Sequence, residues 1–378
     1  MRRAERMIVV LGLVMAAVPA AGQSFTLVGL PAGQTGSLAS GISADGSVVV
    51  GWSSNSNGRG PGWFWTPDGG RTDLSGPGFQ PNTGALGVSG DGRYLVGRNG
   101  ASPSAQVSTA YRYDRQTGVL DQLGVLAPYT RSVANDASFD GAVVVGTLNL
   151  DSSEQFQQAF RWTPSGGMQP LGFTRPGEHF ISQANAVSAD GSTIVGQSAG
   201  FGSEAFVWTS ELGMRALPPV PMPNAGSSIA FGMNADASII VGLGGTSARH
   251  PIRWQDGLAT NLGLPTGFVR GSARATSDDG SVIVGQVIGG ANIQAAIWTP
   301  QTGPMVLSEY LAMNGISVPD GLTLNIATAV SADGRTIAGY TGIPSTTYQG
   351  FVITIPVPAS AIIVIAGLLC TRVRRSRI

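Results

Sequence analysis

The chain has 378 residues, of which 55 are glycine and 12% are charged, and its formal net charge is zero. Once the two ends (residues 1–22 and 355–378) are set aside, 15 basic and 21 acidic side chains remain, a net charge of about −6. An acidic body argues against a nucleic-acid partner, because phosphate binding needs a basic face. The single cysteine, Cys370, lies in the C-terminal end, which excludes a disulfide or a cysteine-based metal site in the body.

Residues 1–22 have the pattern of a secretory signal peptide. Arg2, Arg3 and Arg6 give a basic start, an apolar run follows from residue 7 to 18, and small residues precede the expected cleavage point. A membrane anchor is the alternative, but the run is short for a span. We therefore predict that the export machinery recognises this end of the chain.

One pattern recurs seven times between residues 23 and 354. Each copy has a turn such as Ser43-Ala44-Asp45-Gly46, then a valine-rich segment in which a glycine lies six positions after the aspartate. The copies are spaced by about 43 to 54 residues, in the range of propeller blades or solenoid turns. The aspartates are Asp45, Asp91, Asp140, Asp190, Asp236, Asp279 and Asp333.

Each copy also predicts two further strands. An aromatic segment such as Trp63-Phe64-Trp65 comes some twenty residues after the aspartate. A glycine-containing turn and a short strand with a leucine (Leu74 and Leu307, for example) follow it. Asp-Gly between apolar segments indicates a hairpin, which the fifth copy departs from with Ala237. Four antiparallel strands in each of seven units predict an all-β fold, a seven-bladed β-propeller.

The seventh copy lacks its last strand, because Phe351-Val352-Ile353 runs directly into the C-terminal end. A spare strand precedes the first copy, at Phe25–Leu30. We predict that this N-terminal strand completes the seventh blade and closes the ring, which removes the edges of an open array.

These landmarks resemble the HAF repeat of bacterial extracellular proteins, named for His-Ala-Phe ahead of a tryptophan. Ala159-Phe160-Arg161-Trp162 and Ala205-Phe206-Val207-Trp208 match it except at the histidine, where this chain has Gln158 and Glu204. The resemblance covers roughly residues 24–354. It implies the fold and an extracellular location, but no chemistry.

Residues 355–378 resemble the PEP-CTERM sorting signal of Gram-negative bacteria. A motif formed by Pro356, Val357 and Pro358 precedes an apolar run, and an arginine cluster with Arg372, Arg374 and Arg375 closes it. The resemblance implies handover to an exosortase and a place in the cell envelope, although Val357 stands where the family usually has glutamate. An ordinary C-terminal membrane anchor is the alternative.

The sequence offers few candidates for catalysis. Each turn aspartate is expected to cap its own turn, and His250 falls at a packing position of the repeat. His179, beside Glu178 and Arg175, is a catalytic candidate against the alternative of a solvated polar loop, which we favour. No phosphate loop or zinc motif is present, so we expect no cofactor and no metal site.

The connections predict one plain face and one variable face. The tight turns share one face, whereas the long connections at 52–62, 147–158, 173–183 and 308–325 share the other and suit a polar partner such as a glycan. The main expectation is an exported surface or matrix propeller, a non-enzymatic binding or structural module. The alternative is a carbohydrate-active hydrolase or lyase with its site on the long-loop face. Carboxylates at the mouth of the central channel would favour the enzyme, and small apolar residues the module.

Overall fold

The computed structural model describes residues 24–355, apart from residues 56–57, 101–107, 151–154, 201, 221–225, 246–248 and 343–346. The predicted signal peptide and the sorting motif lie outside the described residues. Within the described ranges, no helix has the length and hydropathy that a membrane crossing requires.

The described residues form an all-β fold of antiparallel sheets, as predicted, and the strands fall into groups of four. The first two groups are β2 (Gly36–Ile42), β3 (Val49–Asn55), β4 (Gly58–Thr66) and β5 (Gly70–Asp73), then β6 (Gly84–Val88), β7 (Tyr94–Gly100), β8 (Ser108–Asp114) and β9 (Leu120–Gly124). The third and fourth are β10 (Arg131–Ala137), β11 (Val144–Asn149), β12 (Gln157–Thr163) and β13 (Gly167–Pro170), then β14 (Ile181–Val187), β15 (Thr193–Ala199), β16 (Ser203–Thr209) and β17 (Gly213–Ala216). A parallel pair between Gln157 and Ile181 joins these two groups into one eight-stranded sheet.

The fifth and sixth groups are β18 (Ser228–Met233), β19 (Ile239–Gly244), β20 (His250–Gln255) and β21 (Leu258–Asn261), then β22 (Arg270–Thr276), β23 (Ile283–Gly289), β24 (Asn292–Thr299) and β25 (Gly303–Val306). The seventh contains β26 (Leu324–Val330), β27 (Thr336–Thr341), β28 (Gly350–Thr354) and the N-terminal strand β1 (Ser24–Leu27). The predicted pairing of the first strand with the last is confirmed, since Phe25 lies opposite Ile353. None of the sheets in the described ranges closes on itself.

The sequence pattern places the elements well and their edges less well. The short α-helix α1 (Leu307–Met313) was not expected, and Leu307, predicted in a strand, begins it. Leu74 likewise follows its short strand β5 instead of lying within it. In both cases the leucine is buried against a neighbouring group. It therefore packs as the repeat predicts, although it does not lie in a strand.

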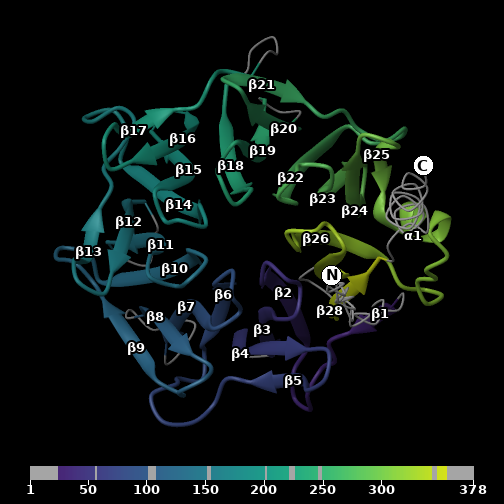
Figure 1. The fold of residues 1–378 in the computed structure, drawn as a ribbon, viewed down its shortest axis with the longest axis horizontal. Helices are drawn as coiled ribbons and strands as arrows, with labels where there is room; N and C mark the ends of the chain where they lie inside the picture. The colour runs from purple at the N-terminus through teal and green to yellow at the C-terminus, as the bar shows by residue number, and fades with distance from the viewer. Residues whose placement is uncertain are drawn as a thin grey trace, which may run out of the picture. The chain divides into compact units, whose positions relative to one another are not determined.

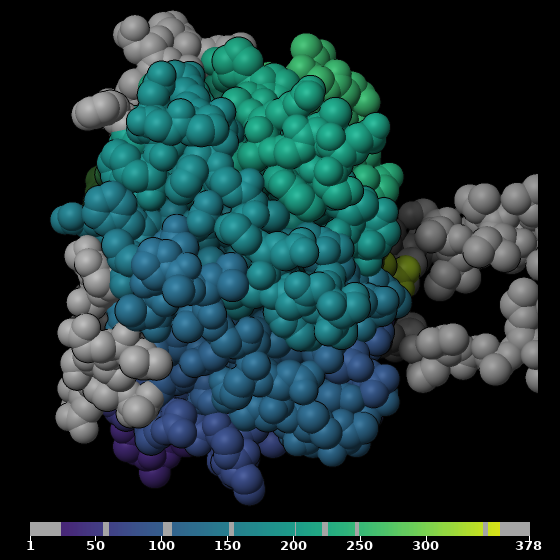
Figure 2. Space-filling model, turned by 90° about the vertical axis from the view of Figure 1, so that its left-hand side faces the viewer, coloured from purple at the N-terminus to yellow at the C-terminus, as the bar shows by residue number. Residues whose placement is uncertain are grey.

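Each hydrophobic cluster joins two consecutive groups of strands. One further cluster joins the last group to the first, through Val352 of β28 and Trp63 of β4. Figure 1 shows the groups around a common centre with β2, β6, β10, β14, β18, β22 and β26 innermost, and Figure 2 shows the side of this unit, where groups coloured from blue to green lie against one another. The aromatic residues of the third strands pack between groups, as expected, and each fully buried one contributes about 1.5–3 kcal/mol.

Hydrogen bonds link each of the seven aspartate turns to the next one. They involve the residue just before the aspartate or, at Asp91, the aspartate itself. Ala332 N–H donates to Ala44 O at 2.8 Å, which connects the last turn to the first. The other links are Ala44 to Gly90, Asp91 to Phe139, Phe139 to Ala189, Ala189 to Ala235 and Asp278 to Ala332, all between backbone groups at 2.9 Å. Between the fifth and sixth turns the acceptor is a side chain, because Ala235 N–H donates to Asp278 Oδ1 at 3.1 Å.

Candidate functional site

The innermost strand of every group carries a β-bulge at the same position. In β22, for example, the register of pairing shifts between Ala273 and Ala275, which leaves Arg274 without an opposite residue. A bulge re-aims the side chain of the extra residue, here toward the centre of the unit. The seven bulged residues are Ser40, Leu86, Asn135, Asn185, Phe231, Arg274 and Thr328.

Four of these bulged residues are used to join neighbouring groups. Asn135 and Asn185 each donate from Nδ2 to a carbonyl of the next innermost strand at 2.8 Å. Ser40 donates to Ala85 O at 2.8 Å, and Thr328 donates to Ala39 O at 2.9 Å. Among the described residues, Arg274 is therefore the polar member of this set that makes no such bond.

The innermost strands line a cavity of about 210 Å³, which we call the central channel. Toward the aspartate turns it adjoins a pocket of about 300 Å³, since Asp136 and Met233 line both. Toward the long connections it adjoins a third pocket of about 430 Å³, since Phe231 and Arg274 line both. Apolar and small residues dominate the channel, but a carboxylate and a guanidinium lie in its wall.

Asp136, in β10, supplies the carboxylate. Burial among the inner strands raises its pKa to about 7, although N–H groups of Val187 and Ala137 donate to it and lower it. The side chain is half-buried, so water in the channel reaches it. A carboxylic acid with a pKa near the working pH is suited to general acid–base catalysis.

Arg274 supplies the guanidinium, and burial lowers its pKa. Its Cζ lies 4.4 Å from the ring centroid of Phe231, and its buried Nε has no hydrogen-bond partner. Within the described ranges no carboxylate forms an ion pair with it. A half-buried cation without a counterion is costly unless a ligand supplies the anion.

The 430 Å³ pocket contains two more arginines, Arg249 and Arg270, both exposed, and we call it the arginine pocket. Arg270 is the first residue of β22 and Arg249 precedes β20, so the pocket opens on the face of the long connections. Its volume lies in the range of small-molecule sites. None of the described residues that line it is acidic.

The cluster predicted around His179 does assemble, with Thr174, Ser198 and Glu204 added to it. His179 Nδ1 lies 3.0 Å from both hydroxyls, and Thr174 also donates to Glu204. The adjoining pocket measures about 190 Å³. Ser198 is fully buried, and the half-buried Thr174 hydroxyl already contacts His179 and donates to Glu204. The cluster holds the connection between β13 and β14, and the polar-loop alternative describes it better than catalysis.

The turn aspartates act locally, as expected. In the turn of the fourth group the Ser188 hydroxyl and the Ser192 N–H donate to Asp190, and they hold its pKa below the usual value. His250, at the start of β20, pairs with Gly244 of β19. The described residues contain no group of three or more histidine, cysteine, aspartate or glutamate side chains that could hold a metal ion.

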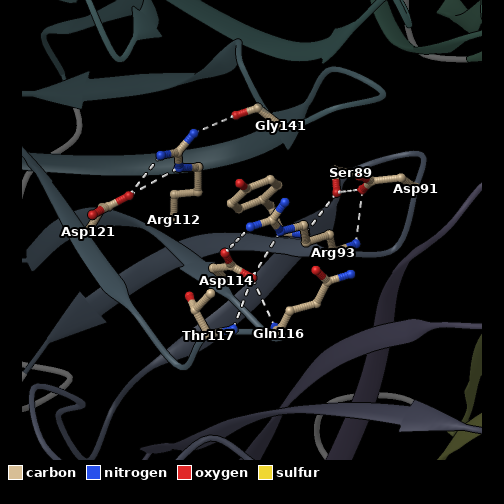
Figure 3. A network of polar contacts seen from close by, with 10 residues as sticks. Ser89, Asp91, Arg93, Arg112, Asp114, Gln116, Thr117, Asp121 and Gly141 are labelled. Carbon is tan, nitrogen blue, oxygen red and sulfur yellow. Dashed lines mark hydrogen bonds and ion pairs between the residues drawn. The ribbon is translucent and has the colours of Figure 1, made fainter.

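A charged network on the turn face is also structural (Figure 3). Arg93 binds Asp114 at 2.6 Å, Arg112 binds Asp121 at 2.8 Å, and the Tyr94 ring lies within 5 Å of both guanidinium carbons. Arg112 also donates to Gly141 O at 3.0 Å and so fastens the second group to the turn of the third. Both arginines are paired with aspartates, which supports a structural role for the network.

Neither Asp136 nor Arg274 is predicted as a site residue from the sequence, although the repeat pattern singles out Asp136. Two residues before the turn serine or asparagine, every copy except the third has glycine or alanine. Asp136 breaks that pattern. The position of Arg274 within the repeat holds residues as different as serine and phenylalanine in the other copies. The repeat pattern therefore does not predict that Arg274 lies in the channel; the β-bulge in the structure places it there.

No protein-family model matches the chain, and no curated protein matches it either. Among solved structures, an oligogalacturonate lyase in complex with manganese is similar, with 14% identity, a TM-score of 0.55, and coverage of 91% of this chain and 95% of that one. An oligogalacturonate lyase from Vibrio parahaemolyticus has 12% identity, a TM-score of 0.56, and coverage of 89% and 94%. At such identities the likeness shows a shared, propeller-like fold.

These neighbours contradict our main expectation of a non-enzymatic binding or structural module, because the two proteins named above that share the fold are lyases. The expectation failed for a physical reason. It relied on the absence of a local motif, whereas an arrangement of this kind draws its site from strands that lie far apart in sequence. Asp136 lies in the third group and Arg274 in the sixth, with two groups of strands between them.

Proposed function

We propose that the chain is a carbohydrate-active enzyme, a lyase for acidic oligosaccharides, whose reaction takes place in the central channel. The observation that carries the proposal is the placement of Asp136 and the unpaired Arg274 in the wall of one cavity. The fold shared with oligogalacturonate lyases supports it.

The architecture that we propose for this enzyme is a seven-bladed propeller closed by β1. The pairing of Ser24 with Thr354 supports the closure, and so does the cluster of Trp63 with Val352 between the last group and the first. The hydrogen bonds from Thr328 to Ala39 and from Ala332 to Ala44 span the same junction. A closed ring keeps the channel walls at fixed positions, as catalysis requires.

The proposed chemistry is β-elimination next to a sugar carboxylate. Ionised Asp136 accepts the proton from the carbon beside the carboxylate. The electron pair of that C–H bond forms a carbon–carbon double bond, the bond to the glycosidic oxygen breaks, and the protonated Asp136 returns the proton to that oxygen. Arg274 faces the carboxylate, where negative charge increases as the proton leaves, and a fixed cation there lowers the barrier.

Among the described residues, no group of three or more histidine, cysteine, aspartate or glutamate side chains could hold the manganese named for one neighbour. The reaction is therefore written with side chains alone. Base catalysis by one positioned carboxylate typically contributes about 10²- to 10⁴-fold to the rate.

The test is an assay of the exported chain on oligogalacturonate, with the ultraviolet absorbance of the unsaturated product as the readout. We expect activity in the wild type and a loss of about 100-fold or more in Asp136→Asn. Failure of the wild type to release unsaturated product from any acidic oligosaccharide would refute the lyase. New reducing ends without that absorbance would indicate the hydrolase.

We also propose that the chain is exported by its N-terminal end and sorted to the cell envelope by Pro356, Val357, Pro358 and the arginines that follow. The composition of the two ends supports this proposal. Mass spectrometry of both termini of the protein in its native host tests it. Intact N-terminal residues would contradict export, and a retained arginine cluster would indicate an anchor in place of exosortase cleavage.

A further inference from the structure

Three buried polar atoms in the arginine pocket lack a partner. They are Nε of Arg274, Oε1 of Gln286 and Oγ of Ser272, and all three residues line the same cavity. Ser272 is 3% exposed. A buried polar atom without a hydrogen bond costs about 1–3 kcal/mol, and native proteins contain few of them. Three in one cavity indicate a place that a ligand completes.

The three atoms require different chemistry from that ligand. Arg274 Nε is a donor and needs an acceptor, which a carboxylate provides. Gln286 Oε1 is an acceptor and needs a donor, which a carboxylate at neutral pH lacks and a hydroxyl provides. Ser272 Oγ accepts or donates. A ligand that satisfies all of them carries an anionic group and a hydroxyl close together.

Charge points to the same class of ligand. Arg249, Arg270 and Arg274 line the pocket without an acidic neighbour, whereas the body of the chain is acidic. A concentrated positive charge on an acidic body attracts anions and directs them to this opening. Because Arg249 and Arg270 lie at the exposed rim and Arg274 lies deeper, the pocket offers positions for more than one anionic group.

We propose that the arginine pocket is a subsite for a uronate unit of an oligosaccharide, in which Arg274 binds the carboxylate while Gln286 and Ser272 bind a hydroxyl of the same ring. Gln286 is thus a specificity residue, which favours uronates over anions that have no hydroxyl and over neutral sugars. This inference rests on the proposed function, because it assumes that an acidic sugar enters at this end of the channel. It concerns binding, however, and is measured without turnover.

The experiment is calorimetric titration of the full chain, as wild type and as Asp136→Asn, with a galacturonate trimer, a neutral galactose trimer and inorganic sulfate. We expect the galacturonate trimer to bind most tightly. Arg274→Met should weaken binding of both galacturonate and sulfate by about 10- to 100-fold, the loss of one charge-assisted hydrogen bond. Gln286→Met should weaken galacturonate by about 5- to 10-fold and leave sulfate unchanged.

Arg335→Met is the matched control, because Arg335 is an exposed arginine beside Asp333 on the turn face. It should leave every affinity unchanged. Arg249→Met and Arg270→Met alter exposed positions and keep the test valid if a buried variant does not fold; each should weaken the trimer more than galacturonate monomer. Equal affinities for galacturonate and galactose trimers, or a Gln286→Met variant with wild-type affinity for galacturonate, would overturn the subsite. Tight binding without cleavage would overturn the lyase and leave the subsite standing.

Discussion

Replacing Asp136 by asparagine should make the protein more stable at alkaline pH, even as it removes the proposed catalytic group. Burial raises the pKa of Asp136 from 3.8 to about 7, so the folded state prefers the protonated form. Stability from this group is therefore fully present below pH 4, where both states are protonated, and is lost as the pH rises through about 7. The asparagine does not titrate, and its side-chain oxygen can still accept from Val187 N–H.

The magnitude follows from the shift. Three pKa units correspond to about 4 kcal/mol, which is an upper bound. Because Asp136 is half-buried and faces channel water, we expect about 1–2 kcal/mol. Besides Asp136, the charged residues that line the channel and the pocket toward the aspartate turns are Arg274 and Asp278, and they lie on opposite sides of Asp136 along the channel. The free energy of unfolding of Asp136→Asn should thus exceed that of the wild type by about 1–2 kcal/mol at pH 8, and this difference should become smaller toward pH 5.

Urea unfolding at pH 5, 6, 7 and 8, followed by tryptophan fluorescence, measures this difference. The matched control is Asp278→Asn, since Asp278 is an exposed carboxylate at the turn end of the channel. It should change stability little and leave the pH dependence as in the wild type. If the unfolding free energies of Asp136→Asn and the wild type depend on pH in the same way, the idea that burial raises the pKa of Asp136 is refuted.

Three further predictions follow from the same structure. Arg274→Met should raise the thermal midpoint while it weakens uronate binding, because it removes an unpaired half-buried charge; a lower midpoint with intact binding would contradict the site. Deleting residues 23–31 should lower the midpoint far more than a terminal trim does, and a truncated protein that melts like the intact one would refute closure by β1. Asp190→Ala should cost about 1 kcal/mol of unfolding free energy at pH 7 and less in acid. The pKa of Asp190 is lowered in the fold, so its stabilisation is lost as the pH falls through that lowered pKa. Equal unfolding midpoints at pH 7 would show that the turn does not need its carboxylate.

The repeat made the strand order predictable, because local chemistry dictates it. Asp-Gly selects a tight turn, and the valine-rich segment after it is buried on both faces. Ala237 of the fifth copy shows how far this extends: it adopts a positive φ of 59°, so the turn persists without its glycine. The missing strand of the last copy likewise pointed to Phe25, which stacks on Phe351.

The candidate site is less predictable from the sequence than the strand order. It depends on the direction in which a β-bulge turns a side chain and on which cavities the packed strands leave between them. Nothing local distinguishes Arg274 from Arg253, which lies on a third strand. From the sequence, His179 and His250 are considered only because a histidine can act as a general base. In the structure, His179 is nearly buried and held by two hydroxyls, whereas Arg274 and Gln286 each contain a buried side-chain atom without a hydrogen-bond partner.

The pairing of Ser24 with Thr354 also places both ends of the described body on the same face. Both strand ends lie at the turn face, since Ile355 N–H donates to Arg335 O just after the last aspartate turn. The arginine pocket opens at the other ends of the strands. A fused domain or a surface linkage made at either of these two ends would therefore be attached at the turn face, opposite the opening of the arginine pocket.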